Sequence, residues 1–269
     1  MKKAFQTWVW CATVLTRSLL SISALAVFLG LWGLAAYGWL WLSESSALVL
    51  LLGLVGAVGL VLAAAAALAG TMSSALEVAA GNAQALSPAR LVRFGGKRFG
   101  QSLLWLVAAA ALGSVLAGVC AWVSQSSLEL ASFLTFHLQV PVSYLLISRV
   151  FTLIEGLIWI AAAGVLLSIL MALFASRSPQ ARRPLGETLL GAAFQTPFLT
   201  SLLSVVVFGG SAYCLAQWRP LAPAGFWDYL QLCLRAGSVL ILLAAGWLFW
   251  LLGLARLNSP RAVAPASEI

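Results

Sequence analysis

One carboxylate lies inside a long apolar stretch of this chain, and its position makes it the first candidate for chemistry. Glu155 stands six positions after Arg149, in the segment Arg149-Val-Phe-Thr-Leu-Ile-Glu155-Gly156. A carboxyl group within a bilayer is costly unless it is protonated, paired or hydrated, so it indicates a proton, cation or substrate site. The structural alternatives are a buried hydrogen bond, an ion pair with Arg235 or Arg219, or a helix that begins later and leaves the group near the interface. Arg149 is a poor partner, because residues i and i+6 do not face each other on a helix.

A second polar group is the basic stretch that follows the second apolar segment. Arg90, Arg93 and Lys97 are spaced at i, i+3 and i+7, so they share one face of a helix. Ser87 suits the cap of that helix, and Pro88 suits its first turn. We expect an amphipathic helix at the inner membrane surface, with its three cations on anionic phospholipid headgroups. The residues broadly opposite are apolar, namely Leu91, Val92 and Phe99.

Two neighbouring features bear on this basic helix. The pair Gly95-Gly96 is expected to weaken it and to bend it, because glycine disfavours the helical state. Glu77 follows the second apolar segment and is expected to pair with a cation of residues 90–98. We therefore assign Glu77 a structural role.

The remaining reactive side chains form no recognisable catalytic pattern. His137 is the only histidine, and no cluster of Cys, His, Asp or Glu has the spacing of a metal site. The sequence contains no P-loop, GxGxxG or HExxH motif, so we predict a non-enzymatic protein without metal or cofactor. The four cysteines form no CxxC pair. Cys214 and Cys233 could form a disulfide, but we favour small apolar fillers as the role of the cysteines.

The elements that must position these residues are long apolar helices. Hydrophobic residues make up 62% of the 269 positions and charged residues only 8%, against about 25% charged in soluble domains. Six charge-free intervals are each long enough for a spanning helix of about 20 residues. The sequence predicts an all-α bundle of six transmembrane helices. We place the spans near residues 19–42, 47–70, 103–123, 150–175, 199–217 and 237–255.

These spans define the domain organisation. Residues 1–18 are expected to form an N-terminal interfacial helix, residues 19–257 the membrane domain, and residues 258–269 a flexible cytoplasmic tail. The connections between spans are short, which leaves no room for a soluble catalytic domain. The first apolar run is too long for a signal peptide and is expected to be retained.

The distribution of basic residues predicts the orientation of the chain. On the six-span topology, twelve of the fifteen basic residues lie on the side that holds both termini, and the others are Arg149, Arg219 and Arg235. Basic residues favour the cytoplasmic side. We therefore expect both termini in the cytoplasm of a cell with a bacterial-type inner membrane. The same distribution explains the net charge of +8 without a nucleic-acid partner.

Residues 130–148 are the ambiguous part of this topology. The stretch 130–148 is apolar enough for a seventh span, but it contains His137, Gln139 and Pro141. A seventh span would also move the basic residues near position 180 to the outer side. We interpret it as an external segment that is either interfacial or re-entrant.

Small residues and tryptophans indicate how the helices pack. Two stripes recur every four positions, one at Gly59, Ala63 and Ala67 and one at Ala109, Gly113, Ala117 and Ala121. Such stripes let helices approach closely, either within the chain or against a partner protein or a second copy. Four tryptophans lie deep in the spans and are expected to pack between helices or to face lipid, namely Trp32, Trp159, Trp247 and Trp250.

A weak internal repeat accompanies the basic helix. Pro88 and Pro184 each have a glycine seven residues later and a leucine fifteen residues later. With the N-terminal interfacial helix as the first unit, this suggests three units of interfacial helix plus helical hairpin. This spacing and the stretch Arg90-Leu-Val-Arg-Phe-Gly-Gly-Lys-Arg-Phe-Gly100 resemble a loose group of uncharacterised bacterial six-span membrane domains. That group includes the membrane domain fused to some glycerophosphodiester phosphodiesterases. The resemblance implies a six-span architecture and supplies no functional residues.

Three functional classes follow from these features. The leading hypothesis is a non-enzymatic membrane component, either permease-like or a scaffold or assembly subunit. The second is a secondary transporter that acts alone with Glu155 at its site, which requires a polar cavity and broken helices near the midplane. The third is an intramembrane enzyme, which requires several polar groups converging at one opening.

Overall fold

Helices account for nearly all of the residues that the structure describes. The structure is a computed structural model, and it describes residues 2–42, 46–82, 86–139, 143–175, 196–218 and 225–258. Of these residues 94% are helical and none forms a strand. This part of the chain contains six helices that are long and apolar enough to cross a bilayer. The predicted fold class, an all-α protein with six such helices, is confirmed.

Each predicted span corresponds to one helical segment. The elements are, in chain order, α1 (Lys2–Arg17), α2 (Leu19–Leu40), α3 (Ala47–Ala79), α4 (Pro88–Lys97), α5 (Phe99–Leu138), α6 (Tyr144–Ala175), α8 (Thr196–Ser204), η2 (Val205–Gly209), α9 (Gly210–Gln217) and α10 (Phe226–Asn258). The fifth span consists of α8, η2 and α9. The predicted third interfacial unit after Pro184 and nearly all of the predicted tail 258–269 lie outside the described residues.

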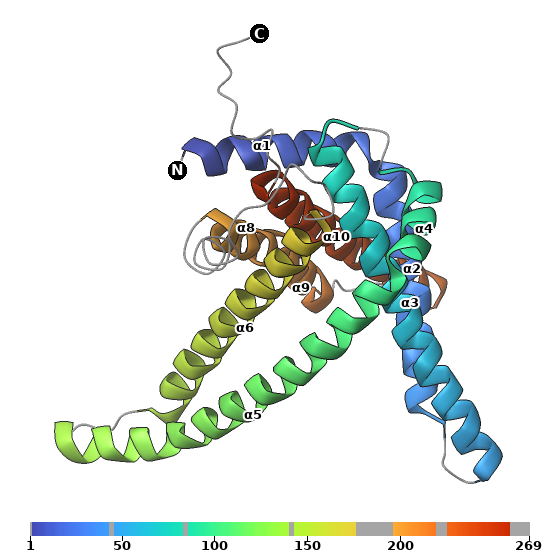
Figure 1. The fold of residues 1–269 in the computed structure, drawn as a ribbon. Helices are drawn as coiled ribbons and strands as arrows, with labels where there is room; N and C mark the ends of the chain where they lie inside the picture. The colour runs from blue at the N-terminus through green and yellow to red at the C-terminus, as the bar shows by residue number, and fades with distance from the viewer. Residues whose placement is uncertain are drawn as a thin grey trace.

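Several helices extend well beyond the apolar stretches that predicted them. Helix α5 has 40 residues and is therefore about 60 Å long, twice the hydrocarbon thickness of a bilayer. Its last part includes residues 130–138, which we had predicted as an interfacial or re-entrant segment. This part bends away from the rest of α5 (Figure 1) and ends at Gln139, which has a left-handed backbone conformation. Residues 140–142 lie outside the described part.

The buried core lies at one end of the bundle. Helix α1 crosses this end, where α3 and α10 terminate and α2 begins (Figure 1). The core joins residues from these helices and from the end of α6, among them Cys11, Ile22, Met72, Phe174 and Leu251. Helix α10 is central, and half of its most apolar 18-residue stretch is buried. We call this region the packed end.

The other ends of two hairpins diverge from the packed end. Helices α2 and α3 form one hairpin and α5 and α6 the other, and the two point in different directions (Figure 1). None of the most apolar 18-residue stretch of α3 is buried, and little of that of α5. Large side chains such as Leu51 and Val115 are therefore exposed to the surroundings. We call these the diverging hairpins.

Candidate functional site

Glu155 lies deeper in its helix than the sequence predicted. Helix α6 begins at Tyr144, six residues before the predicted start, which places Glu155 about 16 Å along the helix axis. Its side chain is half-buried, and its Oε1 atom is buried without a hydrogen-bond partner among the described residues. A buried carboxyl oxygen without a partner is costly, so Glu155 remains the side chain in the spans best placed for a function.

Of the alternatives for Glu155, an ion pair with Arg235 is not formed. The Arg235 guanidinium instead donates from Nη1 to the carbonyl oxygen of Trp218, at 2.7 Å. The bond satisfies a carbonyl at the end of α9, where the helix leaves its last carbonyls unpaired. The other predicted partner, Arg219, lies outside the described residues.

Glu155 lies on the face of α6 that is turned toward α5. Trp159 is one helical turn beyond it and shares that face. The ring of Trp159 lies 3.8 Å from the position that a Cβ atom on Gly113 would occupy. Gly113 belongs to the small-residue stripe of α5, so this stripe serves packing within the chain at that point.

The fifth span contains an irregular turn that the sequence did not reveal. Val205–Gly209 form a π-helical segment between α8 and α9. A π segment inserts one residue into the helical repeat and is frequent at functional sites. The side chain of Phe208 in this segment points toward α10. Its Cβ lies 2.6 Å from the position that a Cβ atom on Gly246 would occupy. Only a glycine at position 246 lets the two helices approach so closely.

The basic helix is present as predicted, and the side that carries Gly95 packs on α3. Helix α4 begins at Pro88 after Ser87, whose backbone is extended and whose side chain makes no capping hydrogen bond. The helix is continuous through Gly95-Gly96, so these glycines do not interrupt it, and the predicted weakening stays a prediction. Gly95 is buried, and a Cβ there would lie 2.8 Å from the carbonyl oxygen of Ala66 on α3. This glycine therefore allows backbone contact between two helices.

The three cations of α4 lie on the side away from α3. By helical spacing, Arg90, Arg93 and Lys97 point opposite to Gly95. Arg90 is half-buried, and Arg93 and Lys97 are exposed. The predicted contact of these cations with lipid headgroups stays a prediction. Glu77 does not pair with them in the described part of the chain, since its Oε2 accepts a hydrogen bond from the Asn82 amide at 3.3 Å.

His137 and the cysteines show no sign of a metal or redox site in the described part of the chain. No group of three His, Cys, Asp or Glu side chains there could hold a metal ion. His137 is exposed near the end of α5, where its ring stacks on Phe133 at a centroid distance of 3.9 Å. All four cysteines are free, Cys214 and Cys233 included. Burial raises the pKa of the Cys11 thiol to about 12, and the nearby Arg256 opposes this only in part.

Hydrogen bonds between tryptophans and hydroxyl groups connect the helices of the packed end. The indole N–H groups of Trp8, Trp247 and Trp250 donate to Thr200, Thr71 and Ser201, at 3.2, 3.4 and 2.6 Å respectively. Trp247 and Trp250 thus pack between helices, as predicted. Trp8 joins α1 to α8. The hydroxyl partners lack a periodic pattern, so nothing in the sequence indicated these pairs.

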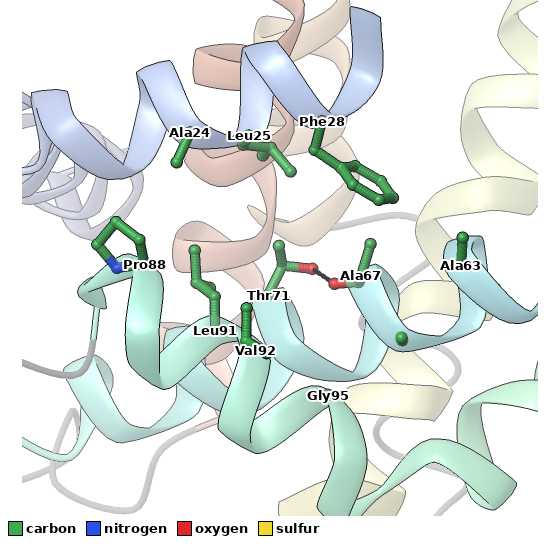
Figure 2. Close-up of a pocket in the computed structure, with 11 residues that line it drawn as sticks. Ala24, Leu25, Phe28, Ala63, Ala67, Thr71, Pro88, Leu91, Val92 and Gly95 are labelled. Atoms are coloured by element: carbon green, nitrogen blue, oxygen red, sulfur yellow. Dashed lines mark hydrogen bonds between the residues drawn. The ribbon is translucent and has the colours of Figure 1, made fainter. Parts of the chain in front are cut away.

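Two apolar cavities lie along the α2–α3 hairpin. The first, of about 270 Å³, lies between α2 and α4 with α3 as its floor. Figure 2 shows the facing walls, with Ala24, Leu25 and Phe28 from α2 and Pro88, Leu91 and Val92 from α4. The second, of about 410 Å³, lies between α2 and α3 nearer the turn of the hairpin. Phe28 and Ala63 border both cavities. Neither cavity contains Glu155.

Comparisons with known proteins add no family. No protein-family model matches the chain, and neither the curated proteins nor the solved structures gave a match. The length and composition of the six helices are consistent with a multi-pass membrane protein.

Proposed function

We propose that this chain is a non-enzymatic component of a membrane system, permease-like or a scaffold, which meets partner helices through its diverging hairpins. The observation that supports it is the contrast in burial between helices of similar apolarity. The most apolar stretch of α3 is wholly unburied, whereas half of that of α10 is buried. A scaffold needs one rigid region and an apolar surface within the bilayer that is free for helices of another protein.

The orientation is part of this proposal. The packed end carries Arg17 on α1 and the cations of α4, and it would face the cytoplasm of a bacterial-type inner membrane. Helices α3 and α10 both end at this side (Figure 1), which agrees with an alternating six-span topology. The diverging hairpins would then span the bilayer toward the outer face.

Photo-crosslinking in native membranes tests the scaffold proposal. A photoreactive residue replaces Leu51 on α3, which is 59% exposed, or Leu251 on α10, which is fully buried and serves as the control. We expect a discrete protein–protein adduct at position 51 and only intramolecular products at position 251. Adducts with lipid alone at position 51, and at Val115 on α5, would reject the proposal.

A second candidate is a secondary transporter with Glu155 at its site. The buried and unpartnered Oε1 atom of Glu155 supports it, together with the π segment in the fifth span. A carboxyl group inside a membrane-spanning helix is a candidate site for a proton, a cation or a substrate. Proton binding and release at Glu155 would couple to the movement of a substrate.

Replacement of Glu155 separates the transporter from a structural role. Glu155→Gln removes the charge without removing a partner, so we expect an unchanged or raised Tm in detergent. In proteoliposomes with an internal pH dye, the transporter predicts proton flux that Glu155→Gln abolishes. Glu129→Gln, an exposed carboxyl on α5, is the matched control and should retain the flux. A lowered Tm for Glu155→Gln, or equal flux in both variants, would contradict the transporter.

A further inference from the structure

The two cavities of the α2–α3 hairpin adjoin each other between the packed end and the hairpin turn, and we call them together the groove. They share Phe28 and Ala63, and together they follow α2 from Ala24 to Trp39. Fifteen residues of helix measure about 22 Å. The hydrocarbon part of one leaflet is about 15 Å deep. The groove is therefore long enough to hold an extended hydrocarbon chain of one leaflet.

The floor of this groove consists of small residues of α3. Gly56, Gly59, Ala63, Ala66 and Ala67 all line it, so the predicted stripe on α3 leaves space instead of contacting a second helix.

The polar groups that border the groove are already satisfied within the chain. The Thr71 hydroxyl donates to the carbonyl oxygen of Ala67 at 2.8 Å, as Figure 2 shows, and accepts from Trp247. The indole N–H groups of Trp32 and Trp39 donate to the carbonyl oxygens of Leu60 and Gly53. A polar ligand would find no free partner among these groups. The groove therefore suits a hydrocarbon chain.

Basic side chains lie on α4 and just before α2, the two helices that form the walls of the groove at its α4 end. Helix α4 forms one wall and carries Arg90, Arg93 and Lys97 on the side away from α3. The opposite wall is α2, which includes Ala24, and Arg17 lies seven residues before Ala24 in the chain. The acid at this end, Glu77, is held by Asn82. An anionic headgroup above the groove would lie among these cations.

From this combination we infer that the groove binds one acyl chain of an anionic phospholipid, with the headgroup at the cations of α4 and Arg17. The inference does not depend on the proposed scaffold or transporter function. It goes beyond headgroup contact, because it assigns a chain-binding groove with Ala63 and Ala67 in its floor. A lipid held there would fill the space between α2 and α4, which otherwise meet mainly through α3.

A photoactivatable phosphatidylglycerol with a diazirine in one acyl chain tests the groove. The full-length protein is reconstituted in phosphatidylcholine vesicles that contain this probe, and the labelled peptides are mapped by mass spectrometry. We expect labelling of Phe28 and Val92 at least threefold above that of Val115, an exposed side chain of α5. The phosphatidylcholine form of the probe should label the groove several-fold less. Equal labelling of groove and α5, or equal labelling by both lipids, would overturn the inference.

Two sets of variants sharpen this experiment. Ala67→Phe fills the floor and should abolish groove labelling, whereas Ala111→Phe on the exposed face of α5 should leave it unchanged. Replacing Arg90, Arg93 and Lys97 together by glutamine should remove the preference for phosphatidylglycerol over phosphatidylcholine. The labelling pattern of the unmodified protein tests the inference by itself, so the test remains valid even when a variant misfolds. Crosslinks from the groove to another protein chain would also overturn it.

Discussion

The packed end and the diverging hairpins are built from helices of similar apolarity. Other helices bury the apolar side chains of the packed end, whereas many of those on the diverging hairpins are exposed. Leu251 on α10 is fully buried by other helices, whereas Leu51 on α3 is 59% exposed. The most apolar stretch of the six belongs to α3, and none of it is buried. Lipid tails are as apolar as leucine, so hydrophobicity alone does not bring helices together in a bilayer.

Close backbone contact and buried hydroxyl groups distinguish the packed end. Gly246 and Gly253 of α10 face Phe208 and Thr200 so closely that a Cβ would not fit without a shift. The Ser204 hydroxyl donates to the carbonyl oxygen of Gly246 at 2.7 Å. The hairpins have fewer such features, and at α2–α3 the small residues leave a groove. Packing and hydrogen bonds, rather than the hydrophobic effect, therefore explain which helices associate.

The largest expected effect compares the same substitution in the two regions. Leu251→Ala leaves a cavity in the core and should lower the free energy of unfolding by about 2–5 kcal/mol. Leu51→Ala, on an exposed face, should change it by about 0.5 kcal/mol. Unfolding by SDS in mixed micelles, followed by helical circular dichroism, measures both. Equal losses would mean that the α3 face is packed as tightly as the core.

An intermediate effect is expected where α4 meets α3. A Cβ at Gly95 would lie 2.8 Å from the Ala66 carbonyl oxygen, whereas one at Gly96 would meet nothing within 4 Å. Gly95→Ala should therefore destabilise the protein by about 1–3 kcal/mol through overpacking. Gly96→Ala should stabilise it by up to about 1 kcal/mol, because alanine favours the helix. The same SDS titration measures both variants, and similar values for both would contradict the close contact.

The smallest effects concern the cysteines. Cys214 is exposed near the end of α9 and Cys11 is buried at the packed end, so a maleimide should label Cys214 but not Cys11 in the folded protein. If the packed end faces the cytoplasm, an impermeant maleimide should reach Cys214 from outside intact cells. Rapid labelling of Cys11 at neutral pH would show that the packed end opens readily.

The raised pKa of Cys11 also predicts a pH dependence of stability. Its pKa rises from 9.0 to about 12 on folding, because burial disfavours the thiolate. The folded state thus favours the neutral thiol, and this contribution is complete below pH 9 and is lost as the pH rises toward 12. The stability difference between the native chain and Cys11→Ala should therefore narrow between pH 9 and pH 11. A constant difference would contradict burial of the thiol.

The sequence by itself determined the number and order of the spanning helices. A charge inside a bilayer is costly, so long charge-free intervals mark the spans without knowledge of the fold. Local signals were equally informative at the start of α4, where Ser87 precedes the helix and Pro88 is its first residue. Glu155 was identified for the same reason, as the carboxylate within a span.

Only the tertiary structure decided which faces meet and which polar groups have partners. In a soluble protein, water selects the buried face and leaves a periodic pattern, but lipid accepts apolar residues on every side of a helix. The contact of Gly95 with Ala66 and the absence of an Arg235–Glu155 pair could therefore not be predicted. The positions of the helix ends could not be predicted either, because α5 continues well beyond its predicted span. Contacts between residues distant in the chain, and not local composition, decide which side chains become partners.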